Sequence, residues 1–129
     1  MRHLAIMLFL ALAPDCAFAQ QSGASLAETE AVARIAECIV QGAPDDWQRL
    51  YVVIDLAKPG DETGQVRYLA TRASAPAEPV AYMPCDTRKP ATILLEARKR
   101  QTPERKGWTG ARLTLHEDGK FELNYDYPK

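Results

Sequence analysis

The chain has 129 residues and a formal net charge of −1, from 16 lysines and arginines against 17 aspartates and glutamates. This length suits one domain and is too short for two well-packed cores. The balanced charge gives no electrostatic reason to expect binding to nucleic acid or to an anionic membrane surface.

Residues 1–19 have the pattern of a secretory signal peptide. A short basic start precedes an apolar run over 4–13, and small residues follow at Ala17 and Ala19. We expect cleavage after Ala19, which would leave 20–129 as an exported, periplasmic or secreted protein. The apolar run is too short to remain as a spanning helix, and no later stretch is long enough, so we expect no stable membrane insertion. The alternative to a signal peptide is that this apolar run forms a buried N-terminal helix.

Export would change the meaning of the cysteines. Cys16 lies in the predicted signal peptide, and its removal leaves Cys38 and Cys85. Two cysteines in an oxidising compartment most often pair, so we predict a disulfide between them. Two separately buried thiols are the alternative. The pair is not a C-x-x-C motif, which argues against redox catalysis.

The first element of the exported chain is a predicted helix. Ser25 and Glu28 have the spacing of a capping box, and Gly42 and Pro44 mark the helix end. Its apolar stripe at helical spacing consists of Val32, Ile35, Ala36, Ile39 and Val40. The charged residues of the segment, Glu28 among them, lie mostly outside that stripe.

Two strands follow in the sequence. Alternating apolar residues predict strands over 49–57 and 65–72, joined by a loop rich in breakers and paired as an antiparallel hairpin. A loop dense in alanine and proline is predicted over 73–79. A short third strand over 80–83 would have to lie at an edge because Pro84 follows it.

A second helix is predicted from 87 to about 100, with Pro90 in its first turn. Basic residues at 98–100 end this helix, where cations complement the dipole. No aromatic residues interleave with them, so a solvated helix end is favoured over a nucleic-acid site. A charged loop is predicted over 102–107.

The last elements form a predicted β-hairpin. A two-residue Asp-Gly loop would mix apolar and polar side chains on both faces. The three-residue loop 117–119 instead pairs Leu115 with Phe121 and Leu113 with Leu123, and puts its glycine at a left-handed bulge position. The opposite, polar face then carries Arg112, Thr114, His116, Lys120, Glu122, Asn124 and Asp126.

The order of elements predicts the fold class. A helix, two or three strands, a second helix and two strands favour an α+β fold. We expect residues 20–129 to form one domain, with an antiparallel sheet of four to five strands, two helices on one face and a C-terminal β-hairpin.

The sequence offers little catalytic chemistry. His116 is the one histidine of the predicted exported chain, and no His, Cys or carboxylate cluster has metal-ligand spacing. Neither G-x-S-x-G nor a P-loop pattern occurs. We therefore predict a binding protein, not an enzyme, with no cofactor or metal. An envelope enzyme would need a concave site around His116 or around paired carboxylates.

Two motifs carry a resemblance to a known family. The first is a Pro-x-x-Trp turn at Pro44 and Trp47, just before the first predicted strand. The second is a C-terminal package of Trp108, Asp118, Gly119, Lys120, Phe121, Tyr125, Asp126 and Tyr127. Together they resemble the YezG-like immunity proteins, small partners of polymorphic bacterial toxins, over about residues 35–127. We expect Trp47, Trp108 and Tyr125 to serve mainly in packing.

The resemblance implies an immunity protein that neutralises a cognate toxin by stoichiometric binding. Members of the family are usually cytoplasmic, and many guard against nucleases, so the predicted signal peptide is a departure from the pattern. An exported member would meet a toxin that attacks the cell wall or membrane, or one in transit. Candidate interface residues are Glu117, Asp118, Glu122, Asn124 and Asp126. The alternative is a small structural or chaperone-like protein of the envelope.

Overall fold

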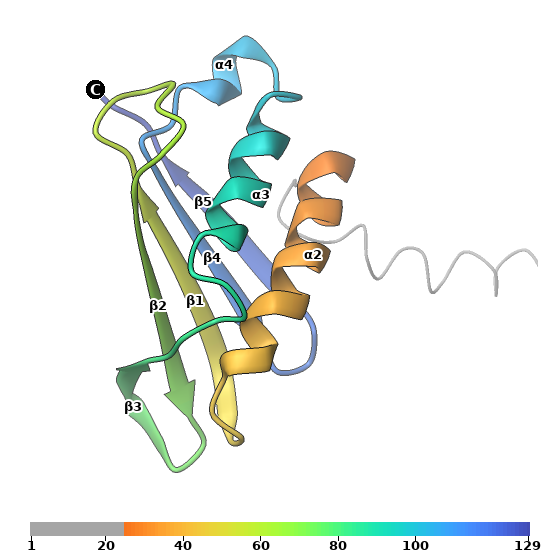
Figure 1. The fold of residues 1–129 in the computed structure, drawn as a ribbon, viewed down its shortest axis with the longest axis vertical. Helices are drawn as coiled ribbons and strands as arrows, with labels where there is room; N and C mark the ends of the chain where they lie inside the picture. Colours follow the sequence, from red (N-terminus) through yellow and green to blue (C-terminus); the bar gives the residue numbers. More distant parts are fainter. Residues whose placement is uncertain (1–24) are drawn as a thin grey trace, which may run out of the picture.

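Two helices lie side by side on one face of a five-stranded antiparallel sheet (Figure 1). The computed structural model describes residues 25–129, so the predicted signal peptide lies outside the described residues. The elements are α2 (Leu26–Gly42), β1 (Trp47–Asp55), β2 (Gln65–Arg72), β3 (Ala75–Ala81), α3 (Lys89–Arg98), α4 (Pro103–Lys106), β4 (Gly110–His116) and β5 (Phe121–Asp126). The strand order is β3-β2-β1-β4-β5. The predicted α+β fold is therefore confirmed.

Helix α2 begins at the predicted capping box. The Ser25 backbone N–H donates to Glu28 Oε1 at 2.8 Å, and the Glu28 N–H donates to Ser25 Oγ at 3.1 Å. Such a cap stabilises a helix by about 1 kcal/mol. The buried stripe of α2 consists of Ala31, Val32, Ile35, Cys38 and Ile39. Val40, expected in this stripe, is exposed instead.

The C-terminal end of α2 is fixed to the segment that precedes α3. The predicted disulfide between Cys38 and Cys85 is present, with the two Cα atoms 4.8 Å apart. The Cys85 N–H also donates to the Cys38 carbonyl at 2.9 Å. A Cβ on Gly42 would lie 1.5 Å from the Met83 carbonyl oxygen, so this helix end requires a glycine. Closing a loop of 47 residues stabilises the fold by roughly 4 kcal/mol in the chain-entropy account.

Strand β1 lies at the centre of the sheet and begins earlier than predicted. It starts at Trp47 and ends at Asp55, whereas the alternation predicted residues 49–57. A register shift between Trp47 and Arg49 marks a β-bulge. Because a bulge interrupts the two-residue period, the regular alternation becomes visible only after it.

The structure corrects the prediction for the segment after β2. Residues 75–79, predicted as part of a loop, and residues 80 and 81, predicted to begin a strand over 80–83, form the single strand β3, Ala75–Ala81. Pro76 and Pro79 both lie within it. Prolines are tolerated here because β3 is an edge strand, where a missing N–H leaves no neighbouring strand unpaired.

The C-terminal hairpin has the predicted register. Leu115 lies opposite Phe121 and Leu113 opposite Leu123. The His116 N–H donates to the Lys120 carbonyl at 2.8 Å and closes the three-residue loop. The glycine of this loop, Gly119, has a φ of +92°, as a left-handed bulge position requires.

The second predicted helix is shorter than expected. It forms α3, Lys89–Arg98, and the predicted charged loop contains the single turn α4, Pro103–Lys106. Asp86 orders the turn that leads into α3, because its Oδ1 accepts from the backbone N–H groups of Arg88 and Lys89 at 2.8 and 3.3 Å. Arg98 is buried, so the prediction of a fully solvated helix end was wrong at this residue.

The core fills the space between the sheet and the two long helices. Leu50, Val52 and Ile54 of β1 point into it, and Trp108 is its largest fully buried side chain. Ile35 reaches it from α2. Among the helices described, none is long and apolar enough to cross a membrane.

Candidate functional site

The sheet surface opposite α2 and α3 is the candidate functional site, called the open face here. Strand register places on it Arg49, Tyr51, Val53, Asp55, Arg67, Leu69, Arg112, Thr114 and His116. Tyr51, Val53 and Leu69 are half-buried at its centre. Polar and charged side chains lie around them. An apolar centre with a polar rim is the usual anatomy of a protein interface.

All five predicted interface residues are exposed: Glu117, Asp118, Glu122, Asn124 and Asp126. The last three lie on the open face along β5, opposite Thr114, Arg112 and Gly110. The first two lie in the hairpin turn. Asp118 also holds that turn, because its Oδ1 accepts from the Lys120 N–H at 2.9 Å. The structure therefore brings three of the five onto the open face.

Charge is divided across the open face. Arg49, Arg67 and Arg112 lie on the three central strands, and Glu122 and Asp126 lie on the edge strand β5. The sequence analysis identified the acidic residues of this edge as candidates but did not bring the three arginines together. The three arginines come from three different strands, so their proximity follows only from the strand order. A partner that covers the face would meet both signs of charge.

His116 lies on the open face beside β5. Its Nε2 is 3.0 Å from Glu122 Oε2, and the Glu122 side chain is mostly exposed. The two residues therefore form a surface pair at the rim of the face. Within residues 25–129, no three His, Cys, Asp or Glu side chains gather as a metal site would require.

A buried polar network, which the sequence did not predict, lies on the helix side of the sheet. Glu28 is only 1% exposed although it lies outside the apolar stripe of α2. Its Oε2 accepts hydrogen bonds from the Tyr125 hydroxyl and from Gln101 Nε2, the latter at 2.9 Å. Arg105 Nη2 lies 3.5 Å from Glu28 Oε1. The carboxylate therefore joins α2 to β5 and to the segment after α3.

The network changes the protonation of its members. Burial raises the pKa of the Glu28 carboxyl, but hydrogen bonds from Ser25 and Tyr125 and the charge of Arg105 outweigh it and leave the pKa lowered. Burial raises the pKa of the Tyr125 hydroxyl, and its hydrogen bond to Glu28 raises it further. Glu28 is therefore held ionised and Tyr125 neutral. The capping box was the one sequence signal that fixed the Glu28 side chain.

Aromatic residues of the family-like motif pack around this network. Trp108 and Tyr125 are stacked, with ring centroids 5.1 Å apart, and Trp108 Nε1 donates to Gln101 Oε1 at 3.2 Å. Arg98 lies over the Trp108 ring at 5.3 Å. Tyr127 meets the edge of Tyr125, with ring centroids 6.4 Å apart. The expectation that Trp108 and Tyr125 serve in packing agrees with these contacts.

The remaining motif residues also have local structural positions. Pro44 accepts the Trp47 N–H at 3.2 Å in the turn that leads into β1. Trp47 is partly buried against the core, and Phe121 is buried. Lys120 is exposed at the end of the hairpin loop. These motif residues therefore lie in the turn before β1, in the core and in the hairpin loop, and do not share one surface.

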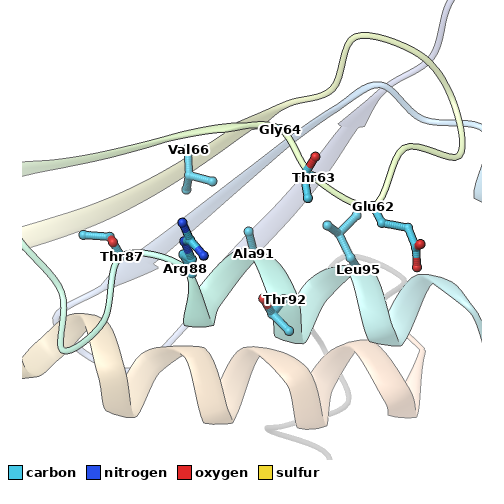
Figure 2. Close-up of a pocket in the computed structure, with 9 residues that line it drawn as sticks. All are labelled: Glu62, Thr63, Gly64, Val66, Thr87, Arg88, Ala91, Thr92 and Leu95. Atoms are coloured by element: carbon cyan, nitrogen blue, oxygen red, sulfur yellow. The ribbon is translucent and has the colours of Figure 1, made fainter.

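A hollow lies between α3 and the segment that leads into β2 (Figure 2). It has a volume of about 430 Å³, and its apolar lining comes from Val66, Ala91 and Leu95. Figure 2 shows Glu62 and Arg88 toward opposite ends of the hollow, so its rim carries both signs of charge. The Arg88 N–H at the start of α3 donates to Asp86 Oδ1 at 2.8 Å. This hollow lies on the helix side of the sheet, away from the open face.

No protein-family model matches the sequence, and no curated protein matches it.

Proposed function

We propose that this protein is an exported immunity protein that neutralises a cognate bacterial toxin by forming a stoichiometric complex. The observation that carries the proposal is the open face, where half-buried Tyr51, Val53 and Leu69 are surrounded by charges of both signs. Its side chains project from strands held on both sides by neighbouring strands. A surface organised in this way binds with little loss of conformational entropy.

Further observations support binding outside the cytoplasm. The disulfide between Cys38 and Cys85 suits an oxidising compartment. The predicted signal peptide suits the same compartment. The toxin would therefore meet this protein in the periplasm or beyond, and inhibition would follow from covering the toxin's active site or blocking a required motion.

Protection from the toxin tests this proposal. The protein encoded beside this gene would be exported to the periplasm of a test strain, with and without the full chain. We expect growth to be inhibited without the chain and restored with it, and the two purified proteins to form a 1:1 complex in size-exclusion chromatography with light scattering. Absence of a complex would refute the immunity role.

The same experiment separates the alternative envelope role. A structural or chaperone-like protein would bind unrelated unfolded proteins and show no preference for the neighbouring gene product. We therefore include reduced, unfolded α-lactalbumin as a second binding partner. Binding to unfolded α-lactalbumin, with no binding to the neighbouring gene product, would favour the chaperone-like role.

A further inference from the structure

A groove of about 310 Å³ opens at the centre of the open face. It is lined by Tyr51, Val53, Arg67, Leu69, Pro79 and Arg112. Its size is at the lower end for ligand sites and suits one or two side chains of a partner rather than a large cofactor. The groove is therefore a specific feature within the broader binding surface.

Two arginines flank the floor of this groove. Arg67 on β2 and Arg112 on β4 lie in register on either side of Val53. Their Cα atoms are two strand spacings apart, or roughly 10 Å. Like charges in one cross-strand row repel each other, so an anion bound between them would be stabilised by both.

Both guanidinium groups remain available for a ligand. Within residues 25–129, Arg112 has no ion pair, and Arg67 has one long contact of 3.7 Å with Asp55. The Arg67 and Asp55 side chains are both more than half exposed, so this contact contributes little stability. Neither arginine is therefore committed to a strong partner within the fold.

The apolar floor of the groove indicates which side chain would accompany the carboxylates of the ligand. Val53 and Leu69 provide half-buried aliphatic surface, and Tyr51 provides an aromatic ring beside them. A neighbouring Leu, Ile or Val side chain on the ligand would bury apolar surface there while its carboxylates meet the arginines. The combination favours a peptide segment in which acidic residues flank an aliphatic one.

We propose that this groove binds an acidic segment of the partner protein, with carboxylates at Arg67 and Arg112 and an aliphatic side chain over Val53 and Leu69. The inference rests on the proposed function and specifies the chemistry that the partner presents. It also gives Arg67 and Arg112 a role separate from that of the acidic residues on β5.

Peptide titration of the full exported chain tests the groove without the partner. The probes are acetyl-Glu-Leu-Glu-amide and the neutral acetyl-Gln-Leu-Gln-amide, followed by ¹H–¹⁵N NMR. We expect the acidic peptide to shift the signals of Tyr51, Val53 and Arg112. The neutral peptide should bind about fivefold more weakly, because it loses the charge interactions.

A matched pair of variants locates the binding. Arg112→Gln should weaken the acidic peptide about fivefold, whereas Arg88→Gln should leave it unchanged. Arg88 is an exposed arginine on the helix side of the sheet, so the second variant makes the same change of charge away from the groove. Both residues are exposed, and retention of the wild-type NMR spectrum shows that each variant is folded.

The outcomes distinguish this inference from the proposed function. Equal binding of the acidic and neutral peptides, or an Arg112→Gln variant that binds as wild type does, would overturn the groove assignment. A 1:1 complex with the neighbouring gene product whose affinity is unchanged by Arg112→Gln would overturn it while leaving the immunity role intact. Acidic-peptide binding without any complex would support the groove chemistry and reject the immunity role.

Discussion

Glu28 shows how one residue can depart from its sequence pattern and still organise the fold. It lies outside the apolar stripe of α2 and is nevertheless buried. Its partners Gln101 and Tyr125 are 73 and 97 residues away in the chain. Local periodicity contains no information on such distant contacts. The sequence could therefore predict the capping role of Glu28 but not its burial.

Replacing Tyr125 with phenylalanine tests the network at the level of one hydroxyl. Tyr125→Phe keeps the ring that stacks on Trp108 but removes a hydrogen bond to the Glu28 carboxylate. We expect the free energy of unfolding to fall by about 1–3 kcal/mol in urea denaturation. Tyr127→Phe is the control, because its hydroxyl bonds to the Arg105 carbonyl at an exposed position. Equal losses of stability in the two variants would show that the buried hydrogen bond contributes no more than the exposed one.

The lowered pKa of Glu28 predicts a pH dependence of stability. Its pKa lies below the ordinary value of 4.5 in the folded protein, so the unfolded chain takes up the proton first. The stabilisation is therefore fully present above about pH 4.5 and is lost as the pH falls through the folded pKa. In thermal unfolding, the Tm of the Glu28→Gln variant should fall less than the Tm of the wild type as the pH is lowered. Identical pH profiles would contradict this assignment.

The elements show where sequence patterns succeed and where they do not. The hairpin register was predicted correctly because a single choice put every apolar residue on one face. Strand β3 was misplaced because its alanines and prolines carry no alternation of apolar and polar side chains. Its position depends on being the edge neighbour of β2, which is a property of the sheet and not of the segment.

The positive φ of Gly119 in the hairpin turn predicts that an alanine there would lower the stability of the protein. Gly119 has a φ of +92°, whereas Gly107 has a φ of −83°, and neither would bring a Cβ near another atom. Gly119→Ala should lower the free energy of unfolding by about 1 kcal/mol through backbone strain alone. Gly107→Ala should be neutral or slightly stabilising. A neutral Gly119→Ala variant in urea denaturation would argue against the three-residue loop.

The disulfide predicts how firmly the long helices are held together. Cys38 belongs to α2 and Cys85 to the segment before α3, so the bond links two parts of one layer. We expect the Cys38→Ala, Cys85→Ala double variant to lose about 2–4 kcal/mol of stability. The wild-type protein in excess reductant should give the same denaturation curve as the double variant. A curve unchanged by reductant would mean that the bond contributes nothing to stability.

At the scale of the whole molecule, the residues that form the core and the residues of the proposed binding surface lie on opposite faces of the sheet. One face of the sheet packs against α2 and α3 and carries the core and the Glu28 network. The open face carries a half-buried apolar centre, three arginines and the acidic edge of β5. The sequence predicted the fold class and the polar side of the hairpin. The proximity of the three arginines could not be predicted, because it depends on the strand order that places β2, β1 and β4 next to one another.

The affinity of the toxin for a variant of the open face shows whether this face forms the complex. Tyr51→Ala removes the aromatic side chain at the centre of the open face, and Tyr127→Ala removes an exposed tyrosine beyond the end of β5. By isothermal titration calorimetry with the neighbouring gene product, we expect Tyr51→Ala to weaken binding at least about tenfold and Tyr127→Ala to leave it unchanged. Binding that is unaffected by Tyr51→Ala would show that the centre of the open face is not the surface that binds the toxin.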